Sequence, residues 1–245
     1  MTVDERSEIT TDGLFQGRLK ILQRKKGYRF SIDAVILAHH ISLKDSDMAV
    51  DLGTGCGIIS LIVAHRNPCA HLYGIEVQKD LCELALRNVR LNDMEERVTI
   101  VCADMKDFKF YLKPGMADVV FSNPPYRKLL SGRLNPDRER AVAKHEIEAS
   151  LSDVMSVAGE LLKPSGRLVV IYPADRTTDL VVGMRAFKLE PKRLRLVHSR
   201  EDSEAELILA EGLKNGKPGL KVSAPLVVHE RDGSYTRQFK EMIGE

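Results

Sequence analysis

Residues 51–57 read Asp-Leu-Gly-Thr-Gly-Cys-Gly, and this glycine-rich stretch decides the fold class of the chain. It follows a short apolar run at 48–52, which is typical of a buried strand, and it opens a helical pattern that ends at Asn67 and Pro68. Glycine lets the backbone take positive φ and approach a ligand closely. A strand, a glycine turn and a helix in this order predict a βα unit with a ligand site at its turn.

Strand and helix signals alternate along the central part of the chain. The predicted strands are 48–52, 71–77, 97–102, 118–122 and 167–172, and the predicted helices are 56–66, 78–92, 146–162 and 175–187. Helical connections of this length imply parallel βαβ units. The last strand-like segments are 193–198, 205–210, 220–228 and 234–239. Because no helix separates them, they predict an antiparallel C-terminal edge.

A smaller unit precedes the first parallel strand. Residues 14–30 predict a hairpin around Lys25, Lys26 and Gly27, and Ser31 is the expected N-cap of a helix over 32–41. About fifty residues are too few for a separate domain. We therefore expect one domain over 1–245, in which residues 1–46 form a flap on a core of residues 47–245.

Composition limits the class of protein. The chain has 245 residues, 43% hydrophobic and 29% charged, which is typical of a globular protein. A formal net charge of only +2 excludes a polycation. Basic residues nevertheless gather in three stretches, 18–29, 127–140 and 185–200. Such clusters favour contacts with the phosphates of a nucleic acid if they surround one cleft.

Cellular context is predicted from what the sequence lacks. No basic and apolar leader begins the chain, and no apolar run approaches the roughly 20 residues of a membrane span, so we expect no membrane partner and a cytoplasmic location. The four cysteines form no Cys-x-x-Cys pair. We therefore expect reduced, mostly buried thiols and no metal site. The sequence does not predict an oligomeric state.

Polar residues end three consecutive parallel strands. Glu76 ends the second, Asp104 the third and Asn123 the fourth. The carboxyl ends of parallel strands share one edge of the sheet, where ligands of open α/β sheets bind. A carboxylate at Glu76 can accept hydrogen bonds from both hydroxyls of a ribose. The dinucleotide fingerprint would require a third glycine at Ile58, so the glycine spacing argues against a nicotinamide-dependent oxidoreductase.

Residues 123–126 read Asn-Pro-Pro-Tyr and carry the expected chemistry. Two prolines cannot extend a central strand, so the chain leaves the sheet here. An aromatic or amide NH₂ group is a weak nucleophile because its lone pair is delocalised. The Asn123 side-chain carbonyl and the Pro124 backbone carbonyl can both accept from such a group and hold it, while Tyr126 offers a face on which a base can stack.

The glycine pattern after Asp51 resembles motif I of the class I S-adenosylmethionine-dependent methyltransferases, and residues 123–126 match the signature of members that methylate planar nitrogens. The resemblance implies a doubly wound, mostly parallel, seven-stranded Rossmann-like α/β sheet. It also implies that Asp104 binds the cofactor's adenine. The predicted catalytic residues are Asn123, Pro124, Pro125 and Tyr126. The predicted cofactor site consists of Phe30, Asp33, Asp51, Gly53, Thr54, Gly55, Gly57, Glu76, Val77, Asp104, Met105 and Asn123.

Flanking segments narrow the resemblance. Residues 29–38, 143–146, 161–167, 225–228 and 233–236 are similar to the bacterial tRNA(Val) adenine 6-amino methyltransferase family. This resemblance implies methyl transfer to an adenine of RNA, expected to be tRNA, without a metal. Methylation of a guanine 2-amino group of rRNA or of a glutamine amide of a protein remains open. A non-catalytic RNA-binding module on the same fold is a further alternative, which the intact motifs disfavour.

Overall fold

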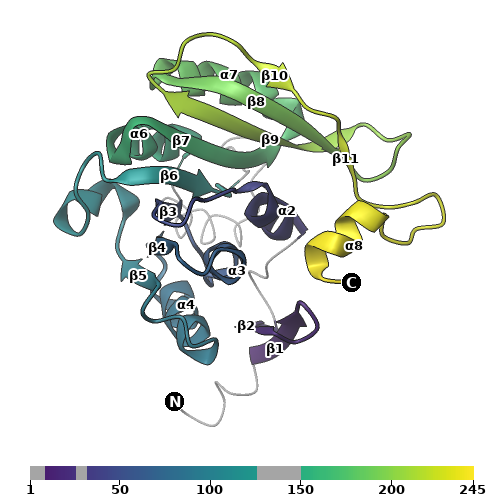
Figure 1. The fold of residues 1–245 in the computed structure, drawn as a ribbon, viewed down its shortest axis with the longest axis horizontal. Helices are drawn as coiled ribbons and strands as arrows, with labels where there is room; N and C mark the ends of the chain where they lie inside the picture. Colours follow the sequence, from purple (N-terminus) through teal and green to yellow (C-terminus); the bar gives the residue numbers. More distant parts are fainter. Residues whose placement is uncertain (1–8, 26–31, 126–149) are drawn as a thin grey trace, which may run out of the picture.

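A computed structural model of the chain describes residues 9–25, 32–125 and 150–245. A hairpin comes first, then a helix, and then a sheet flanked by helices (Figure 1). The hairpin strands are β1 (Ile9–Leu14) and β2 (Leu19–Arg24). The other elements follow as α2 (Ile32–His40), β3 (Met48–Leu52), α3 (Ile58–Arg66), β4 (His71–Glu76), α4 (Lys79–Leu91), β5 (Val98–Cys102), η1 (Met105–Phe110), β6 (Ala117–Ser122), α6 (Leu151–Leu161), β7 (Leu162–Pro173), η2 (Ala174–Arg176), α7 (Thr177–Ala186), β8 (Leu189–His198), β9 (Ala205–Lys214), β10 (Lys221–Val222), β11 (Leu226–Val227) and α8 (Arg237–Ile243).

Within the described residues, the main sheet has nine strands in the order β10-β8-β9-β7-β6-β3-β4-β5, with β11 also paired to β8. The predicted count of seven is therefore wrong, because two segments of only two residues each add to the seven longer strands. Strands β3 to β7 pair in parallel, as predicted. β9 is antiparallel to both β7 and β8, whereas β10 and β11 run parallel to β8. The antiparallel strand thus lies inside the sheet and not at its edge.

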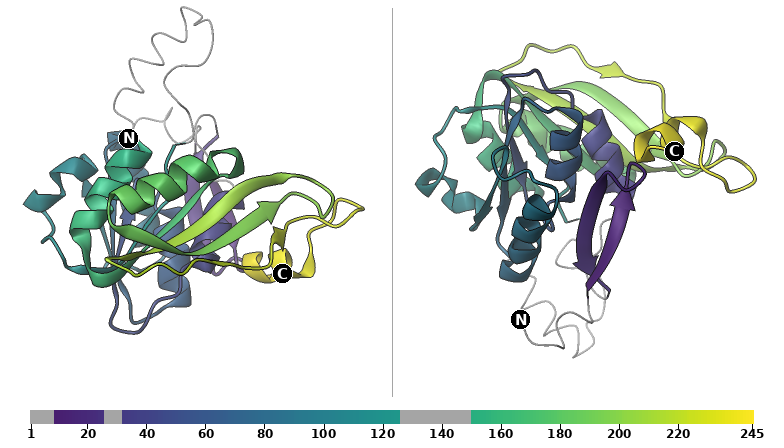
Figure 2. Two further views of the ribbon diagram at one scale, coloured as in Figure 1. Left: turned by 90° about the horizontal axis from the view of Figure 1, so that it is seen from above. Right: turned by 60° about the horizontal axis from the view of Figure 1, so that its bottom comes forward.

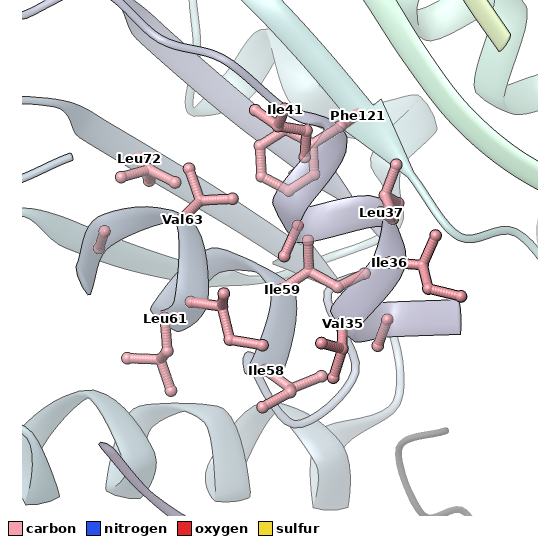
Figure 3. Close-up of a cluster of buried hydrophobic side chains, with 14 of the residues drawn as sticks. Val35, Ile36, Leu37, Ile41, Ile58, Ile59, Leu61, Val63, Leu72 and Phe121 are labelled. Carbon is pink, nitrogen blue, oxygen red and sulfur yellow. The ribbon is translucent and has the colours of Figure 1, made fainter. Parts of the chain in front are cut away.

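Helices cover both faces of the sheet, which confirms the mixed α/β architecture (Figure 1). Alternate residues of each strand pack against the helices of opposite layers, because successive side chains point to opposite faces of the sheet. Ala49 of β3 packs with α2, α3 and α4, and the next residue, Val50, packs with α6 and α7. Figure 3 shows side chains of α2 and α3 converging, with Phe121 of β6 beside them.

The N-terminal hairpin turns earlier than predicted. Its turn lies between Leu14 and Leu19, whereas Lys26 and Gly27 of the predicted turn lie outside the described residues. The Phe15 backbone N–H donates to the Ile243 carbonyl at 3.3 Å, so the turn rests on the C-terminal helix α8, as the right view of Figure 2 shows. The predicted cap at Ser31 lies outside the described residues, whereas the helix that follows is confirmed at Ile32–His40.

Two asparagines dock the hairpin on α4. The Asn88 side chain accepts from the Leu22 backbone N–H at 2.7 Å and donates to the Leu22 carbonyl at 3.0 Å. Asn92 makes the same pair of bonds with Lys20, at 2.9 and 2.8 Å. Each side-chain amide therefore bonds to a backbone N–H and C=O of β2 in the way that a neighbouring strand would.

Two further expectations are corrected. Residues 234–239 were expected to form a strand, but Thr236 is the N-cap of α8, and its Oγ1 accepts from the Phe239 N–H at 3.3 Å. The predicted set of reduced thiols is wrong for Cys82 and Cys102, which form a disulfide between α4 and β5. Cys56 is a buried free thiol and Cys69 an exposed one. None of the helices in the described ranges has the length and apolar character needed to cross a membrane.

Candidate functional site

The site lies where the chain order of the sheet reverses. From β3 the chain moves outward to β4 and β5, and then returns to the other side of β3 with β6. A crevice forms at the carboxyl ends of the strands at such a point. A pocket at this edge is lined by Leu52, Gly53, Gly55, Ile75, Glu76, Val77, Gln78, Leu81, Ala103, Asp104, Met105, Ser122, Asn123, Pro124, Pro125 and Val154.

The glycine loop has the backbone shape that its sequence predicts. Gly53, Gly55 and Gly57 have φ angles of +74°, +59° and +86°, a region that other residues rarely adopt. A Cβ atom added at Gly53 would have no neighbour within 4 Å, so the backbone there faces open space. At Gly57 the same atom would lie 3.4 Å from the Ala85 Cβ. Gly53 and Gly55 therefore face the pocket, whereas Gly57 allows α3 to approach α4.

Asp51 supports the loop from below. Its carboxylate is fully buried, and its Oδ2 accepts from the Thr54 hydroxyl at 2.7 Å and from the Ser60 hydroxyl at 2.8 Å. Burial raises the pKa of Asp51 to about 7; the two hydroxyl bonds oppose this shift, and the charge of Glu76 adds to it. Neither Asp51 nor Thr54 lines the pocket. Their visible role is to hold the loop in shape.

Glu76 lies between the loop and the next helix. Its Oε2 accepts from the Gly55 N–H and its Oε1 from the Gln78 N–H, both at 2.8 Å. The residue is only 5% exposed, so it is not a solvated strand end. Charge-assisted bonds to two backbone amides fix the orientation of the carboxylate. A carboxylate oxygen can accept more than one hydrogen bond, so these two backbone bonds are compatible with acceptance from a ligand hydroxyl.

Asp104 both caps η1 and lines the pocket. Its Oδ1 accepts from the Lys106 N–H at 2.9 Å as the N-cap of η1, and Lys106 Nζ lies 3.4 Å from its Oδ2. The same residue lines the pocket together with Met105, which is buried, and Val77, which is 37% exposed. The pocket thus has apolar surfaces beside its two carboxylates.

Asn123 reaches the pocket from the end of β6. Its Nδ2 donates to Asp33 Oδ2 of α2 at 3.1 Å. Just before it, the Ser122 hydroxyl donates to the Leu52 carbonyl at 2.7 Å and ties β6 to β3. Pro124 and Pro125 follow along the pocket wall. The predicted meeting of Asn123 with the glycine loop and Glu76 at one edge is confirmed.

Some of the predicted residues and basic stretches do not belong to the described part of the pocket. Phe30 and Tyr126 fall outside the described residues, as does the basic stretch 127–140. Arg185 precedes the ten-residue strand β8 and Arg200 follows it, so this basic stretch extends along roughly 30 Å of sheet. In the hairpin, Arg24 pairs with Asp80 at 2.7 Å. The 185–200 stretch therefore extends along the strand, and a gathering of all three basic stretches around one cleft stays a prediction.

Seven of the sixteen pocket-lining residues were not predicted from the sequence. The residues it did not single out are Leu52, Ile75, Gln78, Leu81, Ala103, Ser122 and Val154. Gln78 could have been found, because it follows Glu76 closely at the start of α4. Leu81 and Val154 belong to helices on opposite faces of the sheet, so only the folded structure brings them together.

Comparisons with known proteins agree with this geometry. Residues 29–182 match the family described as the methyltransferase small domain. A tRNA1(Val) (adenine(37)-N6)-methyltransferase of Porphyromonas gingivalis is 32% identical over 194 residues, which cover 78% of this chain and 75% of the relative. A protein of the same name from Tolumonas auensis is 25% identical and covers 91% of both chains.

Solved structures share the fold. A predicted O-methyltransferase of Agrobacterium tumefaciens superposes with a TM-score of 0.70 at 21% identity, covering 86% of this chain and 94% of its own. TYW2 of M. jannaschii in complex with AdoMet superposes with a TM-score of 0.56 at 14% identity, covering 84% and 85%. At these identities the likeness concerns the fold alone.

Proposed function

We infer the function of this chain from the premise that it belongs to the methyltransferase small domain family and is similar to relatives named tRNA1(Val) (adenine(37)-N6)-methyltransferase. The chain is an S-adenosylmethionine-dependent N-methyltransferase. Its substrate is the exocyclic 6-amino group of an adenine in tRNA. The names of the curated relatives support the substrate, and the pocket at the carboxyl edge of the sheet supports the chemistry.

The pocket suits S-adenosylmethionine, which supplies an electrophilic methyl group on a sulfonium when bound. The open space in front of Gly53 allows close approach to the loop backbone, where Gly55 also lines the wall. We assign the ribose hydroxyls to Glu76, since its carboxylate is held ready by two backbone amides. We assign the adenine amino group to Asp104, and the adenine ring to the apolar side chain of Met105.

The remaining predicted cofactor residues have supporting places. Val77 forms part of the pocket wall, whereas Asp51, Thr54 and Gly57 shape the loop from outside the pocket. Phe30 stays a prediction, because it lies outside the described residues.

The Asn-Pro-Pro segment positions the substrate amine. We propose that the Asn123 side-chain carbonyl and the Pro124 backbone carbonyl accept from the two amine hydrogens, which holds the nitrogen and opposes its planarity. Proline has no N–H to compete for the substrate, and its fixed φ stiffens the segment. Stacking of the base on Tyr126 completes this proposal. Most of the rate enhancement then comes from proximity and orientation.

We propose that residues 1–245 form one domain, since Leu19 and Ile21 of the hairpin belong to the same apolar core as α3 and α4. A flap function for residues 1–46 and a cytoplasmic location stay predictions.

The observation that carries the proposal is the convergence of Gly53, Glu76 and Asn123 on one pocket. Replacing Asn123 by Ala tests it. We expect calorimetry to show cofactor binding within about threefold of wild type and tRNA methylation reduced by at least about 100-fold. Asn67, which caps the far end of α3 through a bond to the Val63 carbonyl, provides the matched control Asn67→Ala. Unchanged methylation by the Asn123→Ala variant would refute the assigned role.

A further inference from the structure

A contact between α2 and the Asn-Pro-Pro segment joins residues far apart in the sequence. Asp33 lies in the first turn of α2 and is 8% exposed. Its Oδ2 accepts from Asn123 Nδ2 at 3.1 Å. Asn123 belongs to the pocket wall, whereas Asp33 is not among the pocket-lining residues of the described chain. The sequence-based assignment of Asp33 to the cofactor therefore has no support from its position.

The chemistry of the pair determines the orientation of the amide. An asparagine side chain has a donor prong and an acceptor prong that differ little in shape. An ionised carboxylate can only accept, so it stabilises the arrangement with Nδ2 toward it and disfavours the flipped one, which would bring two oxygens together. The Asn123 carbonyl oxygen then occupies the other prong. This prong is the one that the proposed reaction requires for accepting from the substrate amine.

We propose that Asp33 is a positioning residue, which selects the catalytically competent orientation of the Asn123 amide and does not bind the cofactor. This inference rests on the proposed function of Asn123. It identifies a role for α2 in the reaction.

The burial of α2 restricts the position of Asp33. Residues 34–38 that follow it are all buried, and Val35, Ile36 and Leu37 share a core cluster with Ile58 and Ile59 of α3 (Figure 3). Phe121 lies in the same cluster and precedes Asn123 by two positions in the chain. Helix α2 and the end of β6 thus share one apolar core. This packing holds the donor Asn123 Nδ2 and the acceptor Asp33 Oδ2 at hydrogen-bond distance.

The decisive variant is Asp33→Asn. Asparagine has almost the same shape but can donate as well as accept, so it no longer discriminates between the two orientations of Asn123. With an unmodified tRNA(Val) transcript as substrate, we expect kcat to fall about 10- to 100-fold. The cofactor Kd from calorimetry and the KM for tRNA should stay within about threefold of wild type. Unchanged kcat, or a cofactor Kd raised as much as kcat falls, would overturn the proposal.

A matched control tests whether a loss of stability alone explains the fall in kcat of Asp33→Asn. Asp118 accepts from the Met48 N–H at 2.9 Å and pairs with Lys163 at 2.7 Å, at the opposite edge of the sheet. Asp118→Asn should lower the thermal midpoint without changing kcat. If Asp33→Asn and Asp118→Asn reduce kcat equally at equal loss of stability, Asp33 has only a structural role.

A double-mutant cycle separates this inference from the proposed function. In an Asn123→Ala background, Asp33→Asn should cause no further loss of kcat, and the two changes should be non-additive in the free energy of unfolding, which needs no activity assay. Additive losses in both readouts would overturn the positioning role. If Asn123→Ala alone leaves methylation unchanged, the proposed function of Asn123 fails and this inference with it. If Asn123→Ala abolishes methylation while Asp33→Asn does not affect it, only the role of Asp33 is wrong.

Discussion

Replacing Glu76 by Gln should lower the free energy of unfolding, because the glycine loop loses a hydrogen bond, and should also raise the cofactor Kd. Glu76 accepts from the Gly55 N–H through one oxygen and from the Gln78 N–H through the other, each at 2.8 Å. A glutamine has one acceptor oxygen only, so its NH₂ group must face one of these two backbone donors. Gly55 is buried, so water cannot readily satisfy its N–H if the glutamine turns its NH₂ group toward it, whereas Gln78 is exposed.

The magnitude follows from these two bonds. One charge-assisted hydrogen bond is lost, which costs about 1.5–3 kcal/mol, and the second becomes a weaker neutral bond. We therefore expect the free energy of unfolding to fall by about 2 kcal/mol. If Glu76 also accepts from the ribose hydroxyls, a similar loss in binding raises the cofactor Kd by about 10- to 100-fold.

Calorimetric titration with S-adenosylmethionine and urea unfolding measure the two effects on the same protein. Glu83→Gln on the exposed side of α4 serves as the matched control and should change neither value. A Glu76→Gln protein that is destabilised yet binds the cofactor with wild-type Kd would refute the ribose assignment. Wild-type stability would refute the role of Glu76 in holding the loop.

Three further predictions concern the support of the site. Because burial raises the pKa of Asp51 to about 7, its unfolded carboxyl ionises first, and wild type should lose unfolding free energy as the pH rises from about 4 to about 7. Urea unfolding at pH 5 and pH 7.5 should show a flatter dependence for Asp51→Asn, and parallel profiles would contradict this reasoning. Asn88→Ala removes the bonds that hold β2 and the Cys56 carbonyl and should cost about 2–4 kcal/mol, with faster hydrogen exchange in β2 as the local signature. Protection equal to wild type would count against this docking role. The disulfide closes a loop with a sequence separation of 20, so a reductant should lower the unfolding free energy by about 3 kcal/mol, whereas Cys102→Ala should not respond.

The parallel half of the fold was predictable because its signals are local. Residues 51–57 need positive φ at glycines, and the structure has it at Gly53, Gly55 and Gly57. Alternation of strands and helices then fixes the parallel pairing and brings Glu76 and Asn123 to one edge. The rules for crossovers and strand ends are general, so no tertiary detail was needed.

The N-terminal hairpin shows where local signals fail. Its turn contains Phe15 and Gln16 at φ of +52° and +58°, a conformation that sequence rules assign to glycine or asparagine. Contacts with the far end of the chain compensate, since the Phe15 N–H donates to the Ile243 carbonyl and Gln16 Nε2 donates to the Gly244 carbonyl at 3.2 Å. Such contacts cannot be predicted from a short stretch of sequence, because they join residues far apart in the chain.

The same reason explains the missed site details. Asp33 and Asn123 meet across 90 positions of sequence, and their hydrogen bond depends on how α2 packs on α3 and β6. Cys82 and Cys102 pair because α4 and β5 bring their Cα atoms within 5.7 Å. Neither spacing matches a known motif, so only the folded chain reveals the partners.

The identity of the methylated product tests the central claim most directly. Purified protein is incubated with bulk tRNA and S-adenosylmethionine labelled on its methyl group, and the RNA is then digested to nucleosides for mass spectrometry. The proposed function predicts labelled N6-methyladenosine, formed by wild type and not by the Asn123→Ala variant. Label in N2-methylguanosine of added rRNA, or in glutamine of added protein, with no labelled N6-methyladenosine from tRNA, would contradict it.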